Sequence, residues 1–213
     1  MRKKQKAITI ILLGDIAAGK ATHSGFLRKE YNCVELDMGR ELRKLKARDP
    51  KYAKALKSTL DKGKLAQTEI VRRIIRDFIS RTPATKGILF DGTPKMIGEA
   101  RLVRKWLREA GRGSDQVIVL YLKITKAEIV SRMLGRSTAE QRSDDNLKAL
   151  ENRLKYYKKN ISQVCEYFKK HFVFHTISSM GEIAAVEKNI EKSINAFIQT
   201  QNRTRNRVDP RKR

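Results

Sequence analysis

The sequence predicts an α/β fold of three layers, in which a central parallel sheet of five strands carries helices on both faces. Short apolar, β-branched runs alternate with longer stretches whose apolar residues recur at helical spacing. Strands that alternate with helices form parallel sheets through right-handed crossovers. The chain has 213 residues, enough to bury the core of one such domain.

Five segments are the predicted strands. Four of them are apolar and rich in β-branched residues, and "QVIVLYL" is almost continuously apolar. Such runs are typical of strands that are buried on both faces of a sheet. The four are residues 7–13, 87–90, 116–122 and 172–177, and the less apolar "NCVEL" at 32–36 is the fifth.

A helical insert is predicted over residues 37–66. Its pattern is that of several short helices, because Asp49-Pro50 and Lys62-Gly63 interrupt it. Further on, a long helix is predicted from about Asp144 to about Lys170, where apolar residues alternate steps of three and four and form a core-facing stripe.

Beyond Gln201 apolar residues nearly vanish. We therefore expect residues 201–213 to be a basic, disordered tail behind a folded core that spans residues 1–200.

The net charge of +25 is the most unusual bulk property. The two ends of the chain hold ten basic residues against Asp209 and account for nine of these charges, so sixteen are spread over the folded body. Such a field attracts nucleotides, nucleic acid or anionic lipid without distinguishing among them. Binding of nucleic acid through the basic surface and the ends therefore stays open.

Location and metal content are bounded by what the sequence contains. No apolar stretch approaches the length of a membrane span. Cys33 and Cys165 form neither a disulfide framework nor a zinc site, which fits a reducing, cytoplasmic compartment.

The stretch "LLGDIAAGKATHS" at 12–24 carries the first chemical signal. Gly14, Gly19 and Lys20 match the phosphate-binding pattern G-x-x-x-x-G-K, but Ala21 follows the lysine and the hydroxyl comes one position late, at Thr22. In such a loop the backbone N–H groups and the helix N-terminus bind phosphates while the lysine neutralises their outer oxygens. The residues predicted to bind ATP here are Gly14, Asp15, Ala17, Ala18, Gly19, Lys20, Ala21 and Thr22.

This loop resembles the G-x-P-G-x-G-K-G-T loop of adenylate kinases and related nucleoside monophosphate kinases, in which the threonine stands where Thr22 does. Further stretches resemble that family's motifs in the same order, over roughly residues 7–200. They are "DMGRELRK", "LDKGKLAQTEIVRRII", "GILFDGTPKMIGEA", "SRMLGR" and "RSDDNLKALENRL". The resemblance implies a P-loop kinase fold and a reversible, Mg²⁺-dependent transfer from ATP to AMP that yields two ADP.

The resemblance also implies roles for individual residues. Magnesium would be held mainly through the ATP phosphates and water, with Asp91 in its outer shell. The implied catalytic residues are Lys20, Asp91, Arg132, Arg142 and Arg153, and Arg132 and Arg136 would also bind ATP. The implied AMP-binding residues are Asp37, Met38, Arg43, Lys64, Leu65, Gly92, Lys95, Glu99, Arg142 and Arg153.

The loop and the lid depart from the family pattern. Ala17 replaces a glycine and disfavours a positive φ, which questions the geometry of the loop. The lid is reduced to about residues 136–142. Because a lid excludes water from the transferred phosphate, we expect measurable ATP hydrolysis unless a second subunit covers the site.

The acceptor site departs as well. Lys95 replaces an arginine. A lysine cannot form the two parallel hydrogen bonds by which a guanidinium binds phosphate, so weaker acceptor binding is expected. Glu99 replaces a glutamine, and an ionised glutamate only accepts hydrogen bonds, which suits guanine better than adenine; Asp37 adds another acceptor. AMP is favoured by the overall pattern, while GMP, CMP and UMP stay open. A rival of another class is a nucleic-acid-associated or ribosome-associated protein on a kinase scaffold.

Overall fold

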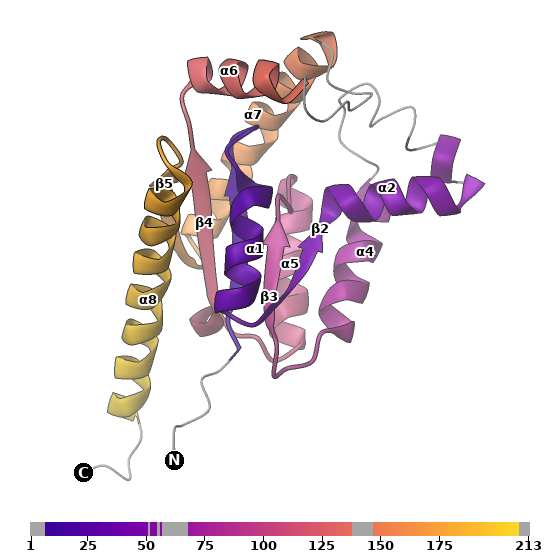
Figure 1. Ribbon diagram of the computed structural model, residues 1–213. Coiled ribbons are helices and arrows are strands. Elements are labelled where there is room, and N and C mark those ends of the chain that lie inside the picture. The colour runs from indigo at the N-terminus through magenta and orange to yellow at the C-terminus, as the bar shows by residue number, and fades with distance from the viewer. Residues whose placement is uncertain (1–6, 51, 55, 57–67, 138–146, 209–213) are drawn as a thin grey trace.

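The computed structural model describes residues 7–50, 52–54, 56, 68–137 and 147–208 (Figure 1). Its sheet has five parallel strands in the order β2-β3-β1-β4-β5. They are β1 (Thr9–Gly14), β2 (Cys33–Asp37), β3 (Gly87–Asp91), β4 (Val117–Lys123) and β5 (Val173–Ser178). The predicted sheet is confirmed, and each predicted strand overlaps an observed one.

Two apolar clusters lie on opposite faces of the sheet, because successive side chains of β1 point to opposite sides. Ile11 and Leu13 belong to the cluster under α4 (Thr68–Arg81), α5 (Ile97–Glu109) and α7 (Leu147–Lys169). Ile10 and Leu12 belong to the cluster under α1 (Lys20–Glu30), α6 (Lys126–Ser137) and α8 (Ile183–Val208). The predicted three layers are therefore present, and a short helical turn, η1 (Ser114–Gln116), precedes β4.

The predicted long helix is α7, and the predicted insert begins with α2 (Met38–Arg48). Asp49 ends α2 in an extended conformation (φ −130°, ψ 109°), as expected of a residue before proline. Residues 57–67, including the predicted break at Lys62-Gly63, and the predicted lid segment 138–142 lie outside the described residues.

The C-terminal helix corrects one expectation. α8 continues to Val208, so residues 201–208 are helical and not the disordered tail that the sequence predicts; residues 209–213 lie outside the described residues. Extending an existing helix costs little, because each added residue gains a hydrogen bond without a new nucleation step. The buried Ile190, Ile194 and Phe197 anchor the preceding turns on the sheet.

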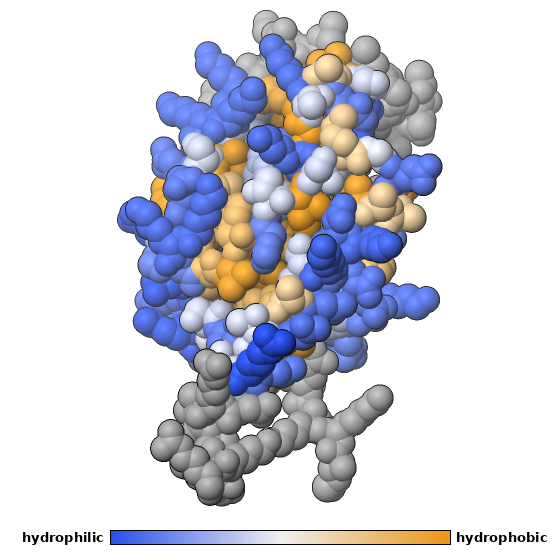
Figure 2. All heavy atoms as spheres, turned by 90° about the vertical axis from the view of Figure 1, so that its left-hand side faces the viewer, coloured by the Kyte–Doolittle hydropathy of each residue, from blue (hydrophilic) through white to orange (hydrophobic). Residues whose placement is uncertain are grey.

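The sheet edge at β5 exposes some apolar surface. Figure 2 shows apolar side chains between hydrophilic flanks on the side where β5 and α8 lie. Val173 of β5 is 38% exposed and Ile183 at the start of α8 is 56% exposed. In the part of the chain that the structure describes, no helix is long and apolar enough to cross a membrane.

Gly87 offers a test of how tightly β2 and β3 are packed. A Cβ added there would lie 2.5 Å from Cys33 Sγ and 2.9 Å from the carbonyl oxygen of Ile8. Overpacking of this kind costs about 1–3 kcal/mol, so Gly87→Ala should lower the melting temperature measured by circular dichroism by several degrees, at roughly 2–4 °C per kcal/mol.

The matched control is Gly25→Ala in α1. Gly25 is exposed, and an added Cβ would meet nothing within 4 Å. Alanine is favoured over glycine inside a helix by about 1 kcal/mol, so this variant should melt at a higher temperature than the native chain. Equal shifts for the two variants would contradict the packing described here.

Candidate active site

A strand, a tight loop and a helix N-terminus form the centre of the site. β1 ends at Gly14, and α1 begins at Lys20 with Gly19 as its N-cap in a left-handed conformation (φ 78°). Among the residues that the structure describes, no side chain caps this helix, and its first turn has no acidic residue. Its first N–H groups and the positive end of its dipole are therefore suited to an anion at the carboxyl ends of the strands.

The start of the loop is fixed to β4 and α7. A Cβ at Gly14 would lie 2.6 Å from the carbonyl oxygen of Leu122, and the N–H of Asp15 donates to that same oxygen at 2.9 Å. The Asp15 carboxylate accepts from Tyr121 Oη at 2.7 Å and from the N–H of Ile124 at 3.0 Å. The side chain of Asp15, an expected ATP-binding residue, thus anchors the loop.

Tyrosine hydroxyls complete this anchor. Tyr157 Oη of α7 donates to the carbonyl oxygen of Gly14 at 2.6 Å. Burial, and then the hydrogen bond to Asp15, raises the pKa of Tyr121 above its ordinary value. The hydroxyl of Tyr121 therefore stays protonated and donates at neutral pH.

Lys20 lies between the ends of β1 and β3. Its Nζ donates to the carbonyl oxygens of Gly14 at 2.8 Å and Asp15 at 2.7 Å. Gly92, just after β3, has φ 64°, and a Cβ there would lie 3.5 Å from Lys20 Cε. The lysine side chain therefore passes beside Gly92, which the resemblance assigns to the acceptor site.

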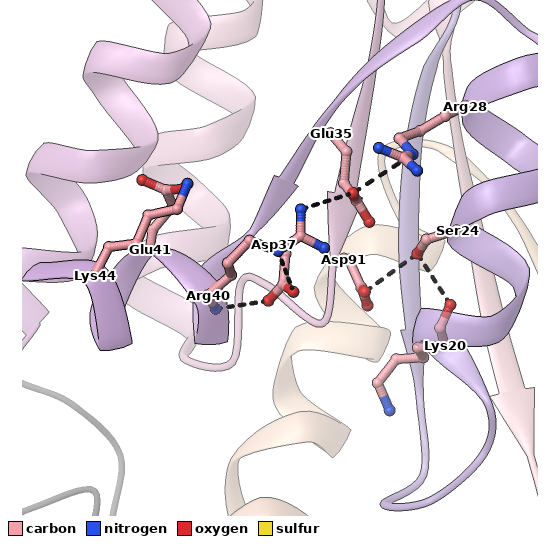
Figure 3. Close-up of polar contacts among 9 residues, drawn as sticks. All are labelled: Lys20, Ser24, Arg28, Glu35, Asp37, Arg40, Glu41, Lys44 and Asp91. Atoms are coloured by element: carbon pink, nitrogen blue, oxygen red, sulfur yellow. Dashed lines mark hydrogen bonds and ion pairs between the residues drawn. The ribbon is translucent and has the colours of Figure 1, made fainter.

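Asp91 meets the same point from β3. Ser24 Oγ lies 3.1 Å from Asp91 Oδ2 and 2.9 Å from the carbonyl oxygen of Lys20 (Figure 3). Burial raises the pKa of the Asp91 carboxyl to about 6; the charge of Lys20 opposes this rise and that of Asp37 adds to it. Ser24 is a site residue that the sequence did not single out, because its partner lies 67 positions away.

The residues at this point fit a magnesium ion that ATP brings with it. Mg²⁺ prefers oxygen ligands, keeps several waters and is usually bound through one or two carboxylates together with substrate phosphates. Asp91 supplies such a carboxylate beside the phosphate loop. Among the described residues, no group of three or more His, Cys, Asp or Glu side chains could hold a metal ion without such phosphates.

Arg132 lies against the loop from the other side. Its guanidinium donates to the carbonyl oxygens of Ala17 at 3.3 Å and Ser179 at 2.8 Å, and to Glu128 at 2.6 Å. Ser179 Oγ in turn donates to the carbonyl oxygen of Ala18 at 2.7 Å. The structure thus gives Arg132 a loop-holding role that the sequence did not predict.

Three expected acceptor-binding residues have structural roles. Asp37 caps α2 through its Oδ1, which accepts from the N–H of Arg40 at 2.9 Å, and it pairs with the Arg40 guanidinium at 3.4 Å (Figure 3). Met38 is buried in the core. Glu99 is 3% exposed, and its Oε2 accepts from the N–H groups of Lys95 at 3.0 Å and Met96 at 3.2 Å. Both carboxylates therefore accept hydrogen bonds from backbone N–H groups at the start of a helix, where such groups have no partner within the helix.

Cationic side chains surround the acceptor side. Arg43 is exposed on α2 and Lys95 is half-buried before α5. Arg72 of α4 was missed by the sequence analysis: it is half-buried, and its Nε, which solvent does not reach, has no hydrogen-bond partner among the described residues. Burial raises the pKa of Glu99, while its backbone hydrogen bonds and the charges of Lys95 and Arg72 oppose that rise, so both cations lie near this carboxylate.

Other expected site residues are only partly described. Thr22 and Ala21 are exposed in the first turn of α1. Arg136 lies in α6 and Arg153 in α7, but their side chains lie outside the described part. Lys64, Leu65 and Arg142 lie outside it altogether.

Comparison with known proteins agrees with this geometry. A protein-family model described as Adenylate kinase matches residues 12–173. The chain belongs to the adenylate kinase family. It is 28% identical over 188 residues to the adenylate kinase of Parabacteroides distasonis, covering 88% of this chain and 98% of that protein. It is 32% identical over 189 residues to the adenylate kinase of Rhizobium meliloti (86% and 97%) and 30% identical over 187 residues to that of Caulobacter vibrioides (88% and 97%).

Membership of the adenylate kinase family confirms several predictions. The chain is a P-loop enzyme of the nucleoside monophosphate kinase class, a family that binds ATP and AMP. The family model begins at Leu12, two residues before the loop, and ends at Val173, the first residue of β5, so it covers the phosphate loop, Asp91 and Arg132 but not Ser179.

Ala17 gives a prediction about the loop. It adopts φ 59°, and a left-handed conformation costs a residue with a Cβ about 1–2 kcal/mol. Glycine avoids this cost but loses about 0.5–1 kcal/mol more entropy on folding. Ala17→Gly should therefore stabilise the fold by up to about 1 kcal/mol and raise the melting temperature by roughly 2–4 °C.

The control is Ala21→Gly, one turn further on. Ala21 is exposed and helical, so glycine should cost about 1 kcal/mol there. If both variants melt at a lower temperature than the native chain, the left-handed conformation of Ala17 carries no strain.

Proposed function

We propose that this chain is an adenylate kinase that reversibly transfers the γ-phosphoryl group of Mg-ATP to AMP and so forms two ADP. One observation carries the proposal: Lys20, Asp91 and the uncapped start of α1 meet where β1 and β3 end. This arrangement holds a phosphate chain and its metal at one point. Arg43 lies on α2, which follows β2, and Lys95 lies in the loop that follows β3, where an acceptor phosphate would approach.

Phosphoryl transfer needs positioning and charge neutralisation from the protein, with no covalent intermediate. The N–H groups of the loop and Lys20 hold the β- and γ-phosphates. Asp91 would hold the water shell of a magnesium ion that arrives with ATP, and that ion would supply neutralisation of the charge that develops during transfer. Arg43 and Lys95 hold the acceptor phosphate so that its oxygen faces the γ-phosphorus.

The remaining arginines complete this cationic surround in the proposal. Arg136 belongs to α6 and Arg153 to α7, the two helices that flank residues 138–146, and Arg142 lies within that segment. The resemblance assigns all three to the phosphates, and their removal should lower the rate of transfer. Arg132 supports the ATP site from behind by fixing the carbonyl groups of Ala17 and Ser179.

GMP is the second candidate acceptor, and Glu99 with Arg72 is the observation in its favour. Guanine presents two donors, which a carboxylate can accept, and two acceptors at O6 and N7, which an arginine binds well. Glu99 and Arg72 lie close enough for their charges to interact. However, Glu99 already accepts two backbone hydrogen bonds, which reduces its capacity to bind a base. AMP therefore stays the proposed acceptor.

A transfer assay with Mg-ATP and AMP, GMP, CMP or UMP tests the proposal, with a blank that lacks acceptor. Turnover with AMP well above the other three is the expected result. Turnover with GMP instead would assign base selection to Glu99 and Arg72. Transfer to none of them would overturn the kinase proposal and favour a scaffold role. The blank measures the ATP hydrolysis expected of a minimal lid, and its dependence on protein concentration reports whether a second subunit covers the site.

A cytoplasmic location belongs to the same proposal. Both cysteines, Cys33 and Cys165, are buried free thiols. Burial raises the pKa of the Cys33 thiol to about 12 and that of Cys165 to about 11, so neither is a reactive thiolate at neutral pH. Unpaired thiols of this kind are suited to a reducing compartment.

The Ser24–Asp91 hydrogen bond predicts a pH effect. Asp91 must be ionised to hold the water shell of magnesium, so kcat/KM for Mg-ATP should fall as the pH drops through about 6, the pKa of Asp91. Ser24 stabilises the carboxylate. Its removal in Ser24→Ala should raise that pKa and move the acidic limb to higher pH by about one unit, since a hydrogen bond to a charged group is worth roughly 1.5 kcal/mol.

The control for this pH profile is Ser80→Ala. Ser80 is exposed on α4, and its Oγ donates to the carbonyl oxygen of Asp77 at 3.0 Å. Its profile should coincide with that of the native chain. An unmoved acidic limb in Ser24→Ala would show that the serine does not tune Asp91.

Lys95 predicts the strength of acceptor binding. An arginine at this position would grip a phosphate through two parallel hydrogen bonds, whereas a lysine acts as a point charge. Lys95→Arg should lower the KM for AMP roughly fivefold, the equivalent of about 1 kcal/mol, and leave the KM for ATP unchanged. Lys86→Arg, on the exposed turn before β3, is the control and should alter neither value. An unchanged KM for AMP in Lys95→Arg would remove Lys95 from the acceptor site.

A further inference from the structure

The kinase site engages few of the chain's surplus positive charges. Many of the others lie on the outer surfaces of α5 and α7. We define the α5–α7 basic face by the exposed basic residues of these helices and the residue after α7: Arg101, Arg104, Lys105, Arg108, Lys155, Lys158, Lys159, Lys169 and Lys170. Against these nine, the exposed acidic residues of the same described surface are Glu109 and Glu166.

The basic residues of α5 form one row. Arg101, Arg104 and Arg108 follow each other at steps of three and four, so they lie on one side of the helix about 5–6 Å apart. The opposite side of α5 holds the buried Val103 and Leu107. None of the three arginines makes an ion pair with a residue that the structure describes. Their guanidinium groups are thus available to an external anion.

The two helices join into one surface. α5 packs against α7 on the same face of the sheet. Burial, and then the charges of Arg104 of α5 and of Lys170 just after α7, lowers the pKa of His171, so both cations lie near this ring. His171 is half-exposed and packs edge-on against Tyr167, with ring centroids 4.5 Å apart. The junction therefore combines two cations with a fixed aromatic ring.

The helices on the other face of the sheet are less basic. The exposed basic residues described on α1, α6 and α8 are Arg28, Lys29, Lys126, Lys188, Lys192 and Arg203, and Glu30 and Glu191 oppose them. Arg28 is in addition paired with Glu35 at 3.6 Å. The exposed surplus of positive charge is thus larger on α5 and α7 than on these three helices.

The chemistry of this face selects its partner. An anionic membrane would also attract cations, but proteins that lie on membranes insert apolar side chains. The exposed large apolar residues of the described chain are Val34, Val130, Val173, Met180 and Ile183, none of them on α5 or α7. Arginine rows without apolar neighbours suit a phosphodiester backbone, and a half-exposed ring offers a surface on which a base can stack.

We propose that the α5–α7 basic face binds the phosphate backbone of a nucleic-acid strand, without reading its sequence. This function is separate from phosphoryl transfer. The cations lie along the outer side of two helices, whereas nucleotide phosphates bind at the carboxyl ends of the strands. Binding should therefore persist in the presence of saturating Mg-ATP and AMP.

The test uses the full chain and fluorescence anisotropy with labelled single strands of RNA and DNA of the same sequence, over a series of salt concentrations. The variant R101Q/R104Q/R108Q removes the α5 row. The variant K188Q/K192Q/R203Q removes the same charge from α8. For single strands the logarithm of affinity falls with the logarithm of salt by about 0.7 per phosphate contact. The α5 variant should therefore bind at least tenfold more weakly and reduce the slope by about 2, while the α8 variant changes little.

Four outcomes decide the proposal. A loss of affinity for the strand in the α5 variant alone, with the kinase activity of both variants at the native level, supports the proposal. The strand that binds more tightly, RNA or DNA, is then the preferred ligand. An equal loss of affinity in both variants would show that binding depends on net charge alone, and this result overturns the proposal. Retention of the α5-dependent binding on phosphatidylserine vesicles, with no affinity for either strand, replaces nucleic acid by a membrane. Displacement of the strand by Mg-ATP and AMP assigns the binding to the kinase site instead.

Discussion

The backbone of Gly14 lies against that of Leu122 without space for a side chain, and the geometry of the phosphate loop depends on this contact. Asp15, the next residue, bonds to β4 through its N–H and its carboxylate. The loop therefore leaves the sheet at a fixed point, and α1 starts at a fixed distance beyond it. Catalysis by positioning requires such precision, since small displacements of phosphate ligands cost large factors in rate.

Acidic side chains near the acceptor side form ion pairs within the protein and so stabilise the fold. Glu35 is 6% exposed and lies between Arg28 of α1 at 3.6 Å and Arg40 of α2 at 3.7 Å (Figure 3). Asp37 holds Arg40 a second time. A buried carboxylate that keeps two cationic partners avoids the cost of an uncompensated charge. The helix that carries Arg43 is thus attached to the sheet by charge as well as by the buried Leu42.

Local patterns explain why the sheet and the loop could be predicted. Apolar runs such as β4 have no alternative to burial, and the glycine-lysine spacing of the loop is a property of neighbouring residues. Ser24 with Asp91 and Ser179 with Ala18 could not be predicted, because 67 and 161 residues separate the partners. Composition alone also misled at residues 201–208, where the polar sequence gave no sign that a helix anchored by Phe197 continues. Asp37 did carry a local signal, since aspartate before a helix is a common N-cap.

The placement of charge matters more than its sum. At physiological ionic strength the field of an exposed charge decays over about 8 Å, so the net charge of +25 acts at any one ligand only through the nearest side chains. Evenly spread, the same charge would neither hold a triphosphate nor track a phosphodiester strand. Cations lie both around the junction of β1 and β3 and along the exposed row of α5. Because the first set is built into loop and strand ends and the second stands on a helix surface, each can change without disturbing the other. If the α5–α7 basic face binds a nucleic-acid strand, as we propose, one small domain holds two polyanionic ligands without competition for a site.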